Sequence, residues 1–582
     1  MSKASCRPHS LSAYHYDSTN RALEALKLSY FTFSSATFPH NSPFAVAAAA
    51  AHLMNCSTPL PTVDLGYEIH QAISFNETGQ YYNFSNIRYA RPPIGSLRFT
   101  APQPPETNRT TIQNGSVGSS CPQALAEWYV CQDALRRGVV ESPSECGKHL
   151  IPPADPLERE DCLFLDVICP HSIFHDQTKK SPVMVWFYGG GYAFGRKGLD
   201  GDPSGLIERS KEVDVQGRGV IFVTFNYRGG AFGFLSGPNV RENGTANVGL
   251  LDQRMALEWV QANIHLFGGD RDQVTVFGQS AGGGSIMHQI TAYGGMQGPV
   301  PFQQAIIHSP GIPLLPGNKG QDDLVQDFLS RLNVSTIQDA RQLPYDVLYK
   351  ANADMVAESP MGTFTWAPGP GCSFVPALPG TLLAQGSFDK SVKIMTAYNH
   401  NETESFASKD NVNNTVFVDS LRTTFPAAQE SIIQYISEVL YPPIFNGSWP
   451  YNDFFSRAKL SLAEAGFVCN TYYLQKSFSM NLEQPTYGYK FSNPPSIHGY
   501  DVFYTFFNGP NDLVSTPIAM IFQRYLVSFA LTGNPNRLAL LDMPTYGTRG
   551  SLLEFNSTYG LEIIPDPSIN KRCEWWQKAL YF

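Results

Sequence analysis

The sequence predicts an α/β fold built on a large, mostly parallel central sheet flanked by helices. Uninterrupted apolar runs are typical of strands that are buried on both faces. These runs alternate with stretches of helical periodicity, as in βαβ units, and glycine-rich turns end several of them. Strands are expected at residues 183–188, 220–225, 274–277, 392–397 and 486–490.

Two helices are marked most clearly by the hydrophobic pattern. Between residues 252 and 264 apolar side chains recur at helical spacing, which predicts a crossover helix between two strands. Asp252 would then stand in the first turn, where the helix dipole favours an anion. A long apolar helix is expected at residues 518–531.

Composition excludes several classes of protein. The chain has 582 residues, 42% hydrophobic and 16% charged, which is typical of a packed globular chain and not of a disordered one. Its net charge of −9 leaves no basic surplus to neutralise phosphates, so nucleic acid is not expected as a partner. The most apolar stretch, residues 44–54, is shorter than the roughly 20 residues of a transmembrane helix.

Domain organisation follows from where the α/β pattern begins. Residues 62–582 show no internal repeat and no low-complexity linker, which predicts one large domain with long insertions. Domains usually have roughly 100–200 residues, so the length of the chain alone would allow three or four domains. Residues 1–61 are interpreted as a leader, in which residues 44–54 form a signal-like segment unusually far from the start of the chain.

Sequons and cysteines favour secretion. Ten cysteines indicate disulfides and therefore an oxidising compartment. Eleven Asn-x-Ser/Thr sequons indicate a glycoprotein, although chance and a surface rich in Ser, Thr and Asn would also produce some of them. They begin at Asn55, Asn76, Asn83, Asn108, Asn114, Asn243, Asn333, Asn401, Asn413, Asn446 and Asn556.

The candidate catalytic motif is Gly-Gln-Ser-Ala-Gly at residues 278–282. This pattern occurs once, directly after the strand expected at residues 274–277 and before a stretch that fits the start of a helix. A sharp turn in this position would expose Ser280 as a nucleophile, and small flanking residues make such a turn tolerable. The alternative is a glycine-rich turn without chemistry.

A second glycine cluster, residues 189–191, ends the strand expected at residues 183–188. Backbone N–H groups without side chains can approach a substrate closely, and with the N–H of Ala281 they would form an oxyanion hole. Each such donor contributes roughly 3–4 kcal/mol of transition-state stabilisation. A phosphate-binding loop is the competing use, but the Gly-x₄-Gly-Lys-Ser/Thr pattern is absent from the sequence.

The partners of the nucleophile are expected downstream, an acid first and a histidine second, each in a loop after a strand. Residues 397–402 and 495–501 meet this requirement. His498 lies in the second loop, where its imidazole can turn toward Ser280. His288 and His308 fall within expected elements and are interpreted as ordinary core or surface histidines.

Seven motifs occur in order along the chain, at residues 160–167, 188–192, 226–228, 267–270, 278–282, 399–402 and 497–501. Together they resemble the type-B carboxylesterase/lipase family, the cholinesterase-like branch of the α/β hydrolases, and particularly its secreted fungal members. The resemblance extends from about residue 62 to the end of the chain. It implies the α/β-hydrolase fold for this region.

The resemblance also implies catalytic roles for six residues. These are Ser280 as nucleophile, Glu402 as acid, His498 as base, and Gly190, Gly191 and Ala281 as the oxyanion hole. Glu404 is the rival acid, and Glu402 is preferred because its spacing from Asn399 and Phe406 matches the family. The sequon at Asn401 is then expected to be unused, because a glycan beside a buried catalytic carboxylate would obstruct folding.

Family resemblance further pairs Cys121 with Cys162, which would close a lid-like loop over residues 121–162. By chain entropy this bridge would contribute about 3–4 kcal/mol. Three apolar residues in the loop recur at roughly helical spacing and would either cover the site or pack as an ordinary helix: Leu125, Trp128 and Leu135. Two further bridges are hypotheses, Cys131–Cys146, which would restrict opening of the loop, and Cys469–Cys573.

The expected activity is hydrolysis of a small-molecule or lipid ester through an acyl-enzyme on Ser280. One alternative is a triacylglycerol or sterol-ester lipase with interfacial activation. A noncatalytic cholinesterase-like binding module is a second, disfavoured because such domains typically lose the nucleophile. No cofactor and no metal are expected. The family more often has Glu in place of Gln279, which bears on substrate preference and pH dependence more than on the chemistry.

Overall fold

The computed structural model describes residues 59–312, 317–481, 484–558 and 560–581. Two compact units divide the chain, and residues 57–510 with 514–582 form the one described below. The leader expected at residues 1–61, including the signal-like segment 44–54, falls outside the described residues except for residues 59–61.

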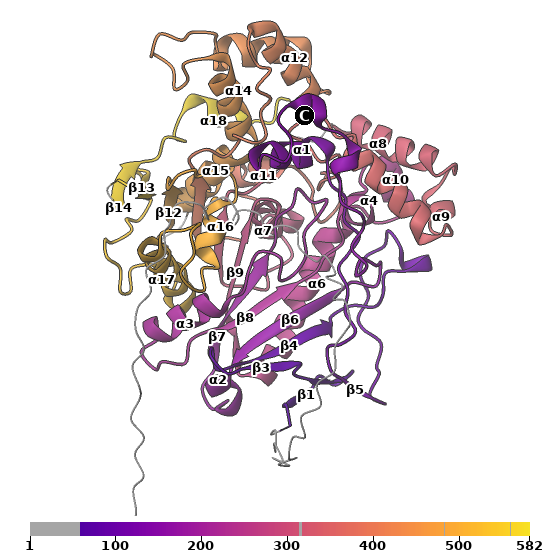
Figure 1. Ribbon diagram of the computed structural model, residues 1–582, viewed down its shortest axis with the longest axis vertical. Helices are drawn as coiled ribbons and strands as arrows, with labels where there is room; N and C mark the ends of the chain where they lie inside the picture. The colour runs from indigo at the N-terminus through magenta and orange to yellow at the C-terminus, as the bar shows by residue number, and fades with distance from the viewer. Residues whose placement is uncertain (1–58, 313–316, 482–483, 559, 582) are drawn as a thin grey trace, which may run out of the picture. The chain divides into compact units, whose positions relative to one another are not determined.

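The centre of the fold is an eleven-stranded sheet (Figure 1) in the order β14-β13-β12-β11-β10-β9-β7-β8-β6-β4-β3. From β13 to β8 in this order every neighbouring pair is parallel, whereas β14, β6, β4 and β3 pair antiparallel. The strands are β3 (Ser74–Asn76), β4 (Tyr81–Arg88), β6 (Phe164–Pro170), β7 (Ser181–Phe187), β8 (Ile221–Phe225), β9 (Gly269–Gln279), β10 (Gln304–His308), β11 (Lys393–Asn399), β12 (Tyr487–Phe491), β13 (Ser551–Asn556) and β14 (Gly560–Pro565). A small second sheet holds β1 (Thr62–Asp64), β2 (Ile69–Gln71) and β5 (Ile112–Gln113).

The strands expected from apolar runs are confirmed as β7, β8, β9, β11 and β12. Every residue of β7 and β8 is buried, as an uninterrupted apolar strand in the middle of a parallel sheet requires. The carboxyl ends of these parallel strands lie at one edge of the sheet, where the loops after them meet.

Helices flank the sheet (Figure 1), and the two expected helices are confirmed as α6 and α17. The helices are α1 (Glu127–Arg136), α2 (His171–His175), α3 (Ser204–Val213), α4 (Gly230–Phe234), α5 (Pro238–Asn243), α6 (Val248–Asn263), α7 (Ala281–Ile290), α8 (Asn318–Arg331), α9 (Ile337–Ala340), α10 (Tyr345–Ala357), α11 (Pro379–Ala384), α12 (Asn414–Thr424), α13 (Glu430–Tyr435), α14 (Phe454–Ala463), α15 (Cys469–Asn481), α16 (Tyr500–Thr505), α17 (Thr516–Thr532) and α18 (Lys571–Trp576). Two π-helical turns, η7 (Ile436–Leu440) and η8 (Glu464–Val468), continue α13 and α14. Within the described ranges, no helix is both long and apolar enough to cross a membrane.

The role expected for Asp252 is wrong. Helix α6 begins at Val248, so Asp252 stands in the second turn and not at the positive end of the dipole. It is fully buried and accepts hydrogen bonds from Arg228 Nε and Nη2, both at 2.7 Å. Burial raises the pKa of Asp252 against the effect of the guanidinium. The carboxylate is therefore the counter-ion of a buried arginine.

Among the described residues, three disulfides join six cysteines as expected: Cys121–Cys162, Cys131–Cys146 and Cys469–Cys573. The first closes the loop of residues 121–162, and the second lies inside that loop. The third ties the start of α15 to α18. The other two cysteines of the described ranges, Cys169 and Cys372, are free thiols.

Candidate active site

Ser280 occupies a strained turn between β9 and α7. Its backbone has φ 59° and ψ −124°, a conformation that side chains rarely adopt. The Ser280 N–H donates to the carbonyl of His308 at 3.1 Å, which fixes the turn against the next strand. A Cβ at Gly278 or Gly282 would lie 2.8 or 2.1 Å from the carbonyl oxygen of Phe187. The glycines of the motif are therefore required by close packing of the turn on β7.

The turn after β7 faces this serine. Gly190 and Gly191 have φ values of +108° and +60°, which favour glycine. A Cβ on Gly190 would lie 2.1 Å from a backbone oxygen four residues further on, and one on Gly191 would lie 2.3 Å from the ring of Phe364. Gly191, Ser280 and Ala281 together line one cavity, whereas Gly190 is not among its lining residues.

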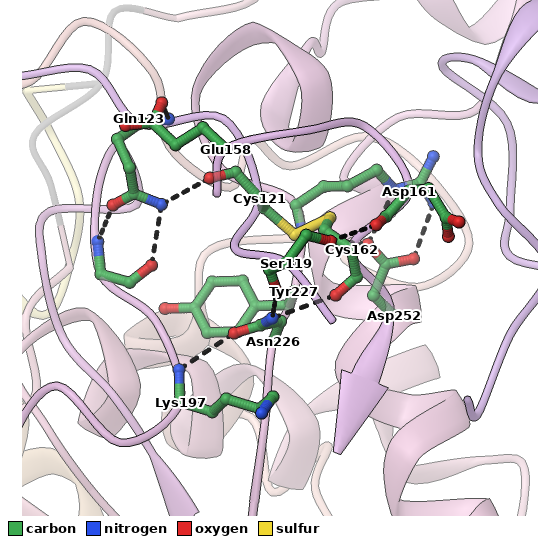
Figure 2. Close-up of a disulfide and its surroundings, with 12 residues drawn as sticks. Ser119, Cys121, Gln123, Glu158, Asp161, Cys162, Lys197, Asn226, Tyr227 and Asp252 are labelled. Atoms are coloured by element: carbon green, nitrogen blue, oxygen red, sulfur yellow. Dashed lines mark hydrogen bonds and ion pairs between the residues drawn. A yellow bond between two sulfur atoms is a disulfide. The ribbon is translucent and has the colours of Figure 1, made fainter. Parts of the chain in front are cut away.

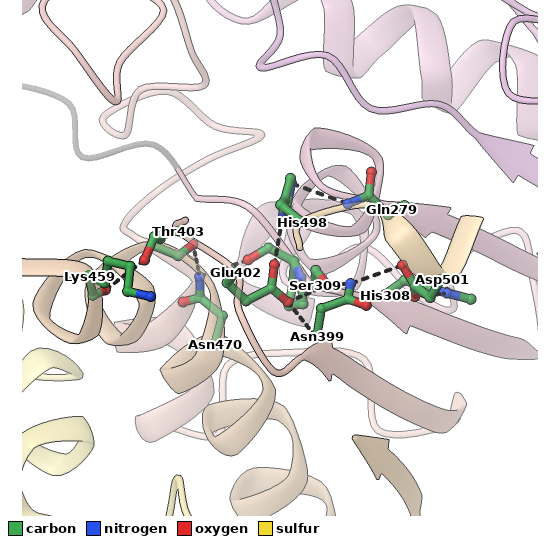
Figure 3. A network of polar contacts seen from close by, with 12 residues as sticks. Gln279, His308, Ser309, Asn399, Glu402, Thr403, Lys459, Asn470, His498 and Asp501 are labelled. Carbon is green, nitrogen blue, oxygen red and sulfur yellow. Dashed lines mark hydrogen bonds and ion pairs between the residues drawn. The ribbon is translucent and has the colours of Figure 1, made fainter. Parts of the chain in front are cut away.

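The expected acid and base are in contact (Figure 3). His498, between β12 and α16, places Nδ1 2.5 Å from Glu402 Oε2, and the Glu402 side chain is almost fully buried. Glu402 lies in the loop after β11, three residues beyond Asn399, so two loops at the carboxyl edge of the sheet bring the pair together. The rival Glu404 is instead half-exposed and pairs with Lys459 Nζ at 2.5 Å.

The second ring nitrogen of His498 has a partner that the sequence did not predict. His498 Nε2 lies 3.1 Å from Gln279 Nε2, the side-chain amide of the residue before the candidate nucleophile. In the described part of the chain, its hydrogen-bond partner is therefore Gln279 and not Ser280. The only sign in the sequence was that this position departs from the family's usual Glu.

A buried polar network holds the Glu402 oxygen that does not contact His498. Glu402 Oε1 accepts from Ser309 Oγ at 2.6 Å and from the Asn399 N–H at 2.5 Å. Asn399 Nδ2 donates to Asp501 Oδ1 at 3.0 Å, and Asp501 Oδ2 lies 3.0 Å from His308 Nδ1. His308 is thus a core histidine, as interpreted, but one that belongs to this network.

The network keeps a second carboxylate charged. Burial alone would raise the pKa of Asp501, but the hydrogen bonds from His308 and Asn399 outweigh it, so the pKa of Asp501 is lowered. Sequence reasoning missed Ser309 and Asp501 as supports of the acid. Asp501 lies within one of the seven family motifs, at residues 497–501, whereas Ser309 lies in none of them.

The cavity at Ser280 has a volume of about 210 Å³ and mostly apolar walls. Phe406 and Phe467 both line it and pack on the imidazole of His498, with ring centroids 5.3 and 4.4 Å away. Phe467 lies in the π-helical turn η8, an irregularity often found at functional sites. The walls include no charged side chain, so the cavity favours neutral groups.

The disulfide-closed loop lies behind this cavity and contributes none of its lining residues. Trp128 in α1 donates from Nε1 to the Thr363 carbonyl at 2.8 Å, and its ring lies 5.2 and 5.4 Å from the rings of Phe364 and Phe406. Thr363, Phe364 and Phe406 are wall residues. Trp128 therefore supports the wall from outside.

The base of the loop, at the Cys121–Cys162 disulfide (Figure 2), is hydrogen-bonded to the segment that carries Gly190 and Gly191. Gln123 Nε2 donates to the Gly195 carbonyl at 3.0 Å, and the Gly195 N–H donates back to Gln123 Oε1 at 2.6 Å. Asn226 Nδ2 donates to the Cys162 carbonyl at 3.1 Å beside the disulfide. The base of the loop and the glycine turn thus form one hydrogen-bonded structure.

A model of the carboxylesterase family matches residues 70–562. The chain belongs to the carboxylesterase family. It is 41% identical over 550 residues to the carboxylesterase patB of Penicillium expansum, covering 89% of this chain and 96% of that protein. A secreted lipase of Arthroderma benhamiae is 30% identical over 442 residues, 72% of this chain and 83% of the other.

Solved structures agree with the family assignment. The crystal structure of Aspergillus niger EstA aligns with a TM-score of 0.74 at 26% identity, covering 89% of this chain and 98% of that one. The α/β-hydrolase fold is confirmed by this likeness together with the mostly parallel sheet. The activity of this carboxylesterase is the hydrolysis of carboxylic esters.

Proposed function

We propose that this carboxylesterase acts through a triad of Ser280, Glu402 and His498. The observation that carries the proposal is the 2.5 Å contact between His498 Nδ1 and the buried Glu402, beside a serine on a strained turn. The N–H groups of Gly190, Gly191 and Ala281 are assigned to the oxyanion hole. A noncatalytic binding module would have no need of this arrangement.

The mechanism follows from these positions. His498 Nε2 exchanges its contact with Gln279 for one with Ser280 and takes the hydroxyl proton as the oxygen attacks the ester carbonyl. Glu402 holds the ring orientation and stabilises the imidazolium, while the backbone N–H groups bind the oxyanion. His498 then protonates the departing alcohol. Water, deprotonated by the same imidazole, releases the acid from the acyl-enzyme.

The substrate is assigned as a neutral ester with a short acyl group. A cavity of about 210 Å³ with uncharged walls supports this assignment, because it is smaller than the usual pocket for a drug-sized ligand. The braced loop argues against a lid that opens at an oil surface. Both the Trp128 hydrogen bond and the internal Cys131–Cys146 bridge restrain it.

The test of the triad is Ser280→Ala, assayed with p-nitrophenyl butyrate. We expect kcat to fall by about 10⁴-fold or more, because the nucleophile acts as a unit with its base. The circular dichroism spectrum and melting temperature should match the wild type. An unchanged rate in a folded variant would reject Ser280 as the nucleophile.

Substrate size is tested separately. Across p-nitrophenyl esters from acetate to palmitate, kcat/KM should peak at the short chains. With tributyrin, the rate should rise smoothly through the solubility limit. A jump in rate at that limit would instead establish a lipase with interfacial activation.

We also propose that the protein is secreted. Three disulfides and the similarity to proteins named secreted lipases in two fungi, Arthroderma benhamiae and Botryotinia fuckeliana, support this. Among the sequons, Asn401 is assigned as unglycosylated, because its side chain donates to the Pro495 carbonyl at 3.1 Å beside Glu402. Mass spectrometry of peptides from the culture medium tests both points. A glycan on Asn401, or a protein retained in the cells, would contradict them.

A further inference from the structure

A second cavity, of about 220 Å³, lies against one face of the central sheet. Strands β4, β6, β7 and β8 supply its floor, and the segment of residues 198–203 with Phe506 supplies the rest. The strand register sets Thr224 beside both Asp166 and Trp186, so these three side chains share the cavity face. No lining residue is shared with the cavity at Ser280.

Thr224 provides the first indication of a ligand. The residue is 3% exposed, and its Oγ1 has no hydrogen-bond partner within the described ranges. Side chains alternate along β8, so Thr224 points to the same side as Phe222, which also lines the cavity. A buried hydroxyl without a partner is costly, and a polar group in the cavity would satisfy it.

Asp200 provides the second indication. Its Oδ2 accepts from Trp186 Nε1 at 2.8 Å, and this is the only hydrogen bond to the carboxyl from the residues that the structure describes. Oδ1 accepts no hydrogen bond from the described residues. Burial raises the pKa of Asp200 to about 6 against the effect of the Trp186 bond, so at pH 8 the group is an anion.

Of the neighbouring carboxylates, one has a cationic partner and one does not. Asp166 is paired with Lys197 Nζ at 2.7 Å. Asp202 accepts hydrogen bonds from the Ser204 N–H at 2.8 Å and from the Tyr81 hydroxyl at 3.5 Å, but within the described ranges it has no ion pair. Asp200 and Asp202 are therefore the carboxylates that give this cavity a negative charge, and of the two Asp200 accepts from Trp186 on the cavity face shared with Thr224.

Aromatic side chains line the cavity next to the carboxylates. Phe506 lies 4.9 Å from Trp186 and 6.1 Å from Phe222 between ring centroids, and Tyr81 lines the side nearest to Asp202. Aromatic surface beside an unbalanced carboxylate favours an organic cation. A metal ion is disfavoured, because no cluster of three or more potential metal-binding side chains occurs in the described ranges.

We propose that this cavity binds a small primary ammonium ion. One N–H donates to Asp200 Oδ1 and another to Thr224 Oγ1, while the carbon chain packs on Phe222 and Phe506. The site is separate from the one proposed for catalysis and does not depend on it.

The test is isothermal titration calorimetry of the full-length protein with n-propylammonium chloride at pH 8 and constant ionic strength. We expect saturable binding that falls at least tenfold in Asp200→Asn and severalfold in Thr224→Val. The isosteric neutral alcohol n-propanol should bind at least tenfold more weakly. Asp272→Asn, which removes an exposed carboxylate from β9, is the matched control and should bind as the wild type does.

Three results would overturn the proposal: absence of binding to the wild type, unchanged binding in Asp200→Asn, or equal binding of n-propanol. The last would show a cavity for water or neutral polar molecules. Melting curves establish that each variant is folded. If Asp200→Asn does not fold, unchanged affinity in Thr224→Val overturns the proposal by itself.

Discussion

The two halves of the proposed catalytic centre are constructed in opposite ways. In the elbow, which is the turn at residues 278–282, and in the glycine turn, residues 189–191, close packing requires positions without side chains, since a Cβ at Gly190 or Gly282 would lie 2.1 Å from a backbone oxygen. The acid and base half places side chains by hydrogen bonds, with Glu402 held by Ser309, Asn399 and His498. Substitutions in the first half should therefore lower the rate through steric clashes. Substitutions in the second half should lower it through loss of charge and of hydrogen bonds.

The largest effect is expected from Glu402→Gln, which keeps the shape of the acid and removes its charge. The amide can no longer stabilise the imidazolium or fix the tautomer of His498, so kcat/KM for p-nitrophenyl butyrate should fall by about 10⁴-fold. Glu404→Gln is the matched control. Because the side chain of Glu404 is 39% exposed and pairs with Lys459, itself 24% exposed, loss of this charge should change the rate less than about twofold. A large loss of rate in Glu404→Gln with little loss in Glu402→Gln would show that Glu404, and not Glu402, is the acid.

The next effect is expected from Gly190→Ala, which tests the half made of backbone. The new Cβ would meet a backbone oxygen at 2.1 Å, so the turn must move and kcat should fall by about 10²–10³-fold, as for a lost oxyanion donor. Gly198→Ala, at φ +75° with no atom within 4 Å of the new Cβ, controls for backbone strain alone. It should retain nearly full activity. Equal losses in the two variants would show that strain, and not the close approach, explains the glycine.

The two glycine-containing turns were easier to predict from the sequence than the hydrogen-bond network around Glu402. The elbow and the glycine turn are local patterns that follow buried strands, and so are visible in a few consecutive residues. Ser309 and Glu402 are 93 residues apart, and His308 and Asp501 are 193 apart. No local pattern links such pairs. The expectation that Asp252 stands at a helix start was wrong for the same reason. Its partner, Arg228, lies 24 residues upstream, so no local pattern pointed to the pair.

A smaller effect is expected from Ser309→Ala, which removes one of the hydrogen bonds to Glu402 Oε1. A bond to a charged group contributes about 1.5–3 kcal/mol, and the Asn399 N–H remains, so kcat should fall by roughly tenfold. KM should not change, because Ser309 does not line the cavity. Ser181→Ala is the control, since this buried hydroxyl has no partner in the described part of the chain. If both variants keep full kcat, the network supports the fold and not the acid.

The smallest effect at pH 8 is expected from Gln279→Glu, where the two halves of the centre meet. Gln279 belongs to the elbow, but its side chain contacts His498 Nε2 at 3.1 Å. A carboxylate in this position would stabilise the protonated imidazole, so the acid limb of the kcat/KM profile should move to higher pH by about one unit or more. On the acid side of the profile the rate of Gln279→Glu should therefore fall clearly, whereas on the alkaline side it should change only a few-fold. Gln279→Met, of similar length and without charge, separates this effect from loss of the amide contact. An unshifted profile in Gln279→Glu would show that this contact does not persist in the working enzyme, and that the two halves are electrostatically independent.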